Sequence, residues 1–181
     1  IAIGPQARAT ANETIAMGGN ASASGVYAIA IGYNSTADKE RAFAAGAQAK
    51  ATAKGAMALA AFANATGIDS ISAGYGANAT GGNSIALGTG TLADADDSFA
   101  SGYQSQALAT ASFAVGAVAK SSGVNSFAMG TETEATADDA YAFGTKAKAE
   151  GLNSVALGTF AIANSTDSYA LGVHSLASGE N

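Results

Sequence analysis

A glycine recurs every 14 residues along this 181-residue chain. It stands at residues 4, 18, 32, 46, 74, 88, 102, 116, 130, 144, 158 and 172, and Ala60 fills the one missing place. No insertion breaks this register, so the chain is one 14-residue unit repeated thirteen times. A fixed period over a whole chain indicates an architecture in which each unit buries surface by stacking on its neighbours.

We number the repeat so that this glycine is repeat position 4. Positions 1 and 3 are mostly large and apolar, position 2 is Ala except at Ser72, and position 9 is Ala except at Ser121. This alternation predicts two short strands, at positions 1–3 and 7–9, joined by turns at the glycine and at the Asn/Asp-Ser pair of positions 13 and 14. A coiled coil is excluded, because a glycine in every second heptad costs a helix about 1 kcal/mol.

Two strands and two turns close one coil, so we expect an all-β parallel roll, a β-solenoid of about thirteen coils. Residues 14 apart then stack about 4.8 Å from each other. Opposite charges recur at that spacing in Lys120–Glu134–Lys148, Glu132–Lys146 and Glu40–Lys54. We also expect an aromatic ladder inside the roll, formed by Phe99, Phe113, Phe127 and Tyr141.

Residue size predicts which face of the first strand is inside. We expect the large side chains of positions 1 and 3 to fill the interior, and the small residues of positions 14 and 2 to pack against other copies of the chain. A roll with so thin a core needs added burial, although Ala is also simply neutral at an edge. The expected interface residues are Ala16, Ala30, Ser84, Ala86, Ser126, Ala128, Ser154, Ala156 and Ala170.

The second strand presents a variable outer face, typical of contact with solvent. Some of its residues are nevertheless apolar or aromatic, and we predict a ligand surface at Phe62, Leu92, Phe160, Ile162, His174 and Leu176. The alternatives are a local packing feature or an interface with a following domain.

Composition excludes several functions. Only 12% of the residues are charged and the net charge is -6, which opposes nucleic-acid binding. Cysteine is absent, which excludes disulfides. His174 is the only histidine, and the acidic pairs Asp96-Asp97 and Asp138-Asp139 lie three coils apart in no calcium-binding pattern. We therefore predict no catalytic residue, no metal and no cofactor.

The most regular copies of the repeat read Asn83-Ser84-Ile85-Ala86-Leu87-Gly88, Asn125-Ser126-Phe127-Ala128-Met129-Gly130 and Asn153-Ser154-Val155-Ala156-Leu157-Gly158. This hexamer at 14-residue spacing resembles the head domains of trimeric autotransporter adhesins, the YadA-like family. The resemblance implies a left-handed parallel β-roll, with three chains side by side as a homotrimer and the small side of the motif strand facing the trimer core. Two coils depart from the motif, with Tyr27-Ala28 and Arg41-Ala42 in place of Asn-Ser.

The resemblance also implies a non-enzymatic adhesin head exposed on the bacterial cell surface, at the outer membrane. Its expected partners are host extracellular matrix proteins (collagen, fibronectin and laminin) or cell surfaces. We expect residues 1–181 to be a single head domain and a fragment, in which the signal peptide, neck, stalk and membrane anchor are absent. The membrane is then contacted only through that absent C-terminal anchor.

Two other functions stay open: a structural spacer in a long surface fibre, and an ice-binding solenoid. The second needs a regular Thr-x-Thr face, which only Thr89/Thr91 and Thr131/Thr133 suggest. An acyltransferase built from hexapeptide repeats is disfavoured by the 14-residue period and the single histidine.

Overall fold

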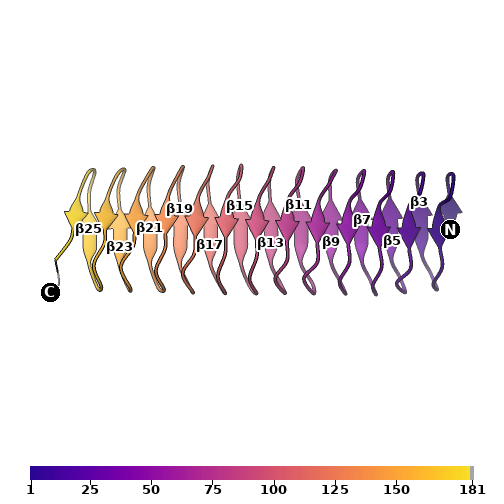
Figure 1. Cartoon of the computed structure of the whole chain (residues 1–181), viewed down its shortest axis with the longest axis horizontal. Coiled ribbons are helices and arrows are strands. Elements are labelled where there is room, and N and C mark those ends of the chain that lie inside the picture. The colour runs from indigo at the N-terminus through magenta and orange to yellow at the C-terminus, as the bar shows by residue number, and fades with distance from the viewer. Residues whose placement is uncertain (180–181) are drawn as a thin grey trace. The chain divides into compact units, whose positions relative to one another are not determined.

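A computed structural model of the chain describes residues 1–179, and every regular element among them is a strand of two or three residues. Within each of the two units described below, odd-numbered strands form one parallel sheet and even-numbered strands another, as the successive coils in Figure 1 show. The chain divides into two compact units, Ile1–Gly90 and Thr91–Asn181. Each is a parallel β-solenoid, and together they supply about 13 coils, as the period predicts.

The strands of the first unit follow repeat positions 1–3 and 8–9. Its odd-numbered sheet contains β1 (Ala2–Ile3), β3 (Ile15–Met17), β5 (Ile29–Ile31), β7 (Phe43–Ala45), β9 (Met57–Leu59), β11 (Ile71–Ala73) and β13 (Ile85–Leu87). Its even-numbered sheet contains β2 (Arg8–Ala9), β4 (Ser22–Ala23), β6 (Thr36–Ala37), β8 (Lys50–Ala51), β10 (Asn64–Ala65) and β12 (Asn78–Ala79).

The strands of the second unit follow the same positions. Its odd-numbered sheet contains β15 (Phe99–Ser101), β17 (Phe113–Val115), β19 (Phe127–Met129), β21 (Tyr141–Phe143), β23 (Val155–Leu157) and β25 (Tyr169–Leu171). Its even-numbered sheet contains β14 (Leu92–Ala93), β16 (Gln106–Ala107), β18 (Lys120–Ser121), β20 (Glu134–Ala135), β22 (Lys148–Ala149), β24 (Ile162–Ala163) and β26 (Leu176–Ala177).

The predicted 14-residue register is confirmed within each unit. In the first unit Ala2 is opposite Ala16, and the Gly18 amide donates to the Ile3 carbonyl at 2.8 Å. The predicted charge ladders form ion pairs at Glu40–Lys54 (3.2 Å), Glu132–Lys146 (3.5 Å) and Glu134–Lys148 (3.0 Å), and Lys120 is opposite Glu134 in the register.

The repeated glycine is required by the close approach of neighbouring coils. A Cβ on Gly32, which has φ +123°, would lie 2.6 Å from the carbonyl oxygen of Gly46. The second turn uses the Asn/Asp-Ser pair: position 13 has positive φ, as at Asn125, a conformation that Asn and Asp tolerate better than most residues. The following serine closes this turn, since the Ser126 hydroxyl donates to the Gly123 carbonyl at 2.6 Å.

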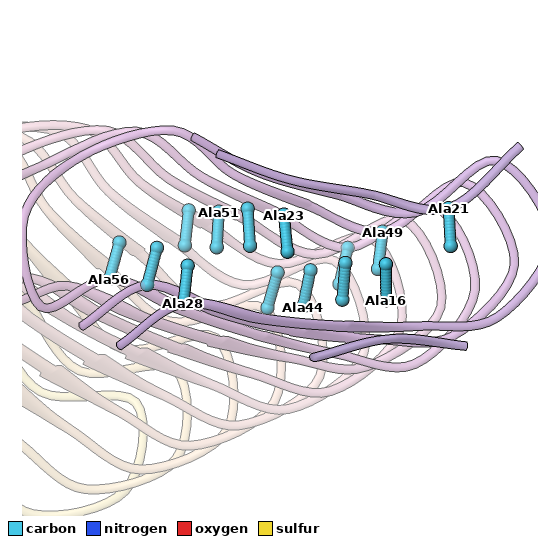
Figure 2. Close-up of a cluster of buried hydrophobic side chains, with 14 residues drawn as sticks. Ala16, Ala21, Ala23, Ala28, Ala44, Ala49, Ala51 and Ala56 are labelled. Carbon is cyan, nitrogen blue, oxygen red and sulfur yellow. The ribbon is translucent and has the colours of Figure 1, made fainter. Parts of the chain in front are cut away.

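Among residues 1–179, the interior between the two sheets contains only small side chains, from repeat positions 2, 7, 9 and 14. Figure 2 shows Ala23 and Ala51 pointing from one sheet toward Ala16 and Ala44 on the other. The largest fully buried side chains among the described residues are threonines and serines.

The prediction that the small face of the motif strand lies outside the roll is therefore wrong. The nine predicted interface residues are 0–2% exposed within the single chain, so they cannot contact another copy: Ala16, Ala30, Ser84, Ala86, Ser126, Ala128, Ser154, Ala156 and Ala170. The physical reason is the length of the coil. Fourteen residues bring the two sheets so close that only methyl and hydroxyl groups fit between them, and the large side chains of positions 1 and 3 are left outside.

Candidate binding surfaces

The outward face of the odd-numbered sheet is apolar in both units. Ile31, Met129 and Leu157 are 39%, 42% and 50% exposed in the single chain. The predicted aromatic ladder forms on this face and not inside the roll: the Phe113 ring stacks on those of Phe99 and Phe127, with centroids 4.7 and 5.3 Å away. Rows of exposed apolar side chains of this kind mark interaction sites.

The outward face of the even-numbered sheet carries a hollow of about 340 Å³ in the second unit. It is lined by Val118, Glu132, Glu134, Lys146, Lys148, Phe160 and Ile162. Two ion pairs cross it, with side chains 38–52% exposed. The hydrogen bond that Lys148 donates to Glu134 raises the pKa of the Lys148 amine, although partial burial opposes the shift.

The Phe160 ring in this hollow has a neighbouring side chain on each adjacent coil. His174, one coil further on, stacks on it with centroids 4.9 Å apart and planes at 4°. The Lys146 Nζ, one coil earlier, lies 5.7 Å from its centroid. These two residues come from the coils on either side of Phe160, which remains 41% exposed.

A different aromatic pair lies on the first unit. Phe62 and Tyr75 meet edge to face, with centroids 5.3 Å apart and planes at 69°. Beside them the Asn64 Nδ2 donates to the Asn78 Oδ1 at 2.9 Å. The sequence predicted Phe62 but missed Tyr75, because Tyr75 occupies a turn position and approaches Phe62 only when coils stack. Asparagine at position 8 of two successive coils was the signal for the amide pair.

The six predicted ligand residues all lie on the outward side of the even-numbered sheet. Phe62, Phe160 and Leu176 are 45%, 41% and 64% exposed, His174 is exposed, and Leu92 and Ile162 are half-buried. The structure brings Phe160, Ile162, His174 and Leu176 together on adjacent coils. Leu92 is opposite Gln106, away from this group. Their role in binding a ligand stays a prediction.

The two aspartates of one turn in the second unit accept hydrogen bonds from the preceding coil. Asp138 Oδ1 accepts from the Val124 amide at 2.8 Å, and Asp139 Oδ1 accepts from Asn125 Nδ2 at 3.2 Å. No group of three or more His, Cys, Asp or Glu residues within 1–179 has a metal-binding arrangement.

The two Thr-x-Thr segments present no outward threonine array, because Thr91 and Thr133 are buried. None of the described residues lies in a helix long and apolar enough to cross a membrane.

Comparisons with known proteins address the repeat directly. A family model described as the YadA head domain repeat (2 copies) matches residues 1–21, 23–49, 37–59, 65–91, 93–119, 112–133, 121–140, 135–161 and 163–181. A search of curated proteins found no match. A search of solved structures found the crystal structure of the collagen-binding domain of the Yersinia adhesin YadA, at 22% identity, 94% coverage of this chain, 82% coverage of that chain and a TM-score of 0.26.

A TM-score of this size gives no basis for transferring detail between the two structures. The repeat matches stand independently of it and extend over nearly the whole chain. The chain belongs to the family of YadA head domain repeats.

Proposed function

We propose that this chain is the head domain of a non-enzymatic bacterial surface adhesin, spanning residues 1–181. Three copies lie side by side, each a left-handed parallel β-roll, and their outer faces attach the cell to its surroundings. Membership of the YadA head repeat family supports the adhesin role. The proposed location is the extracellular side of the bacterial outer membrane.

The main support for a trimer is the apolar outward face of the odd-numbered sheet. Side chains such as Met17 and Leu157 are 39% and 50% exposed in the single chain, although each contributes about 1.5–3 kcal/mol when fully buried. We place the contact between copies on repeat positions 1 and 3, because the small residues of positions 14 and 2 are enclosed within each roll. The even-numbered sheet then stays outermost and available to a ligand.

The proposed ligands are extracellular matrix proteins (collagen, fibronectin or laminin) or the surface of another cell. The test is binding of the purified trimer to each matrix protein immobilised on a sensor surface, with albumin as the control. Saturable binding to at least one matrix protein supports the proposal. Binding to none of them overturns matrix adhesion and favours a spacer within a surface fibre.

A further inference from the structure

Phe62 and Tyr75 form an open aromatic corner on the first unit. They belong to neighbouring coils and are 45% and 59% exposed. Gly76, which follows Tyr75, adds no side chain, and apart from its two chain neighbours no described residue has an atom within 4 Å of the place where its Cβ would be. The corner is therefore bounded by two rings and has room beside them.

The backbone of this turn follows the rest of the repeat, and only its residue types differ. Ala60 replaces the repeated glycine yet keeps φ +115°, and Phe62 has φ +61° two residues later. A positive φ costs a non-glycine residue roughly 1–2 kcal/mol, and a bulky residue is an outlier there. The same φ recurs at repeat position 6 of the other coils, so Phe62 is distinguished by its ring and not by its backbone. Phe62 places an aromatic ring at the repeat position where the preceding coil has Gln48.

The polar groups beside the corner have unused hydrogen-bonding capacity. Asn64 and Asn78 are half-buried, and their mutual bond uses one N–H of Asn64 and one lone pair of Asn78. The Asn64 oxygen and the Asn78 amide protons remain for hydroxyl groups.

The charge beside the corner is positive. Lys50 is opposite Asn64 on one side and Thr36 on the other, so neither strand neighbour offers it a carboxylate. In contrast, Lys148 on the second unit is paired with Glu134.

We propose that Phe62, Tyr75, Asn64, Asn78 and Lys50 form a binding site for an acidic saccharide. The apolar C–H face of a sugar ring packs on the aromatic corner, its hydroxyls bond to the two amides, and its carboxylate or sulfate pairs with Lys50. An acidic sugar has an apolar ring face, several hydroxyls and an anionic group, which match the aromatic corner, the two amides and Lys50. This inference rests on the proposed adhesin role, because it names a ligand class for that role.

The test is saturation-transfer NMR and titration of the whole chain with sialyllactose and a heparin disaccharide as acidic probes and lactose as the neutral one. We expect saturable binding of an acidic probe. Phe62→Gln and Tyr75→Ala should weaken it about tenfold or more. Both substitutions introduce the residue of the preceding coil, Gln48 or Ala61, so the fold is preserved. Lys50→Gln should reduce the acidic probe to the affinity of lactose.

Tyr103→Ala is the matched control, since it also removes an exposed tyrosine ring from repeat position 5. Binding should be unchanged, because Tyr103 belongs to the second unit and Gly90 stands where Phe62 stands beside Tyr75. No saturable response to any of the three sugars overturns the proposal, as does a Phe62→Gln variant that binds like the parent. An equal loss in Tyr103→Ala also overturns it.

Two outcomes separate the parts of the proposal. Equal affinity for acidic and neutral sugars, unaffected by Lys50→Gln, overturns the role of Lys50. Matrix-protein binding is measured on the same samples: a chain that binds a matrix protein but no sugar overturns only the saccharide site, and a chain that binds sugar but no matrix protein overturns only matrix adhesion.

Discussion

Phe127 and Ala128 are adjacent on β19 and point to opposite sides of the sheet. Ala128 is fully buried between the two sheets, whereas the Phe127 ring lies outside, stacked on Phe113 with centroids 5.3 Å apart. The smaller residue is therefore the core residue, and the larger one is a surface residue of the single chain. The same division recurs along the odd-numbered sheet of each unit and determines how substitutions act.

Ala128→Leu should be strongly destabilising. In the part of the chain that the structure describes, no fully buried side chain is larger than threonine. Three added carbon atoms therefore force the sheets apart, and overpacking of this kind costs roughly 1–3 kcal/mol or more. Chemical denaturation followed by circular dichroism measures the loss. Met129→Leu is the control, because Met129 is 42% exposed and its neighbours can adjust. An Ala128→Leu variant as stable as the parent contradicts the narrow interior.

Local spacing was sufficient to predict the coil, its strands and its ladders from the sequence. The glycine period determines the turns, and residues such as Glu134 and Lys148 then become neighbours because they are 14 apart. Alternation also shows that Phe127 and Ala128 face opposite ways, but it cannot show which one is inside. The usual rule that large apolar residues are buried gives the wrong answer here. The answer depends on the distance between the two sheets, and that distance is set only when two short strands and two tight turns close into a coil.

The candidate sites were predictable only in part for a related reason. Phe62 is visible as an aromatic residue at a position that is often polar. Tyr75 cannot be recognised in this way, because it lies in a turn. It comes next to Phe62 only when the coils stack in the register that pairs Asn64 with Asn78.

Ser72→Ala should stabilise the chain. The Ser72 hydroxyl is buried without a hydrogen-bond partner, and the equivalent residue is Ala in every other repeat. Removing an unpaired buried hydroxyl should gain about 1 kcal/mol, observed as a higher melting temperature. Ser84→Ala should do the opposite, because the Ser84 hydroxyl donates to the Gly81 carbonyl at 2.7 Å. A loss of stability in Ser72→Ala indicates that this hydroxyl has a bonding role.

The Glu134–Lys148 pair should make a small contribution to stability that disappears in alkali. The hydrogen bond to Glu134 raises the folded-state pKa of Lys148 above its ordinary value of 10.5, so the folded chain holds this proton more tightly than the unfolded chain. The contribution is complete below 10.5 and is lost as the pH rises through the higher folded-state value. It should be only a few tenths of a kcal/mol, since both side chains are more than a third exposed.

Thermal melting of the parent and of Glu134→Gln across the alkaline range measures this contribution. The difference between their melting temperatures should narrow as the pH passes 10.5, and added salt should reduce it at lower pH. A difference that stays constant through that range shows that Glu134 stabilises the fold without involving the Lys148 proton.

Met129→Glu should dissociate the proposed trimer without unfolding the chain. Met129 is 42% exposed in the single chain, so the carboxylate is tolerated there, whereas burial against another copy leaves an unpaired charge in the interface. Sedimentation velocity at micromolar concentration should show the parent as a trimer and the variant as a monomer, with unchanged circular dichroism. Gln106→Glu introduces the same charge on the even-numbered sheet and should sediment like the parent. A parent that sediments as a monomer overturns self-association, and a trimeric Met129→Glu variant excludes this face as the interface.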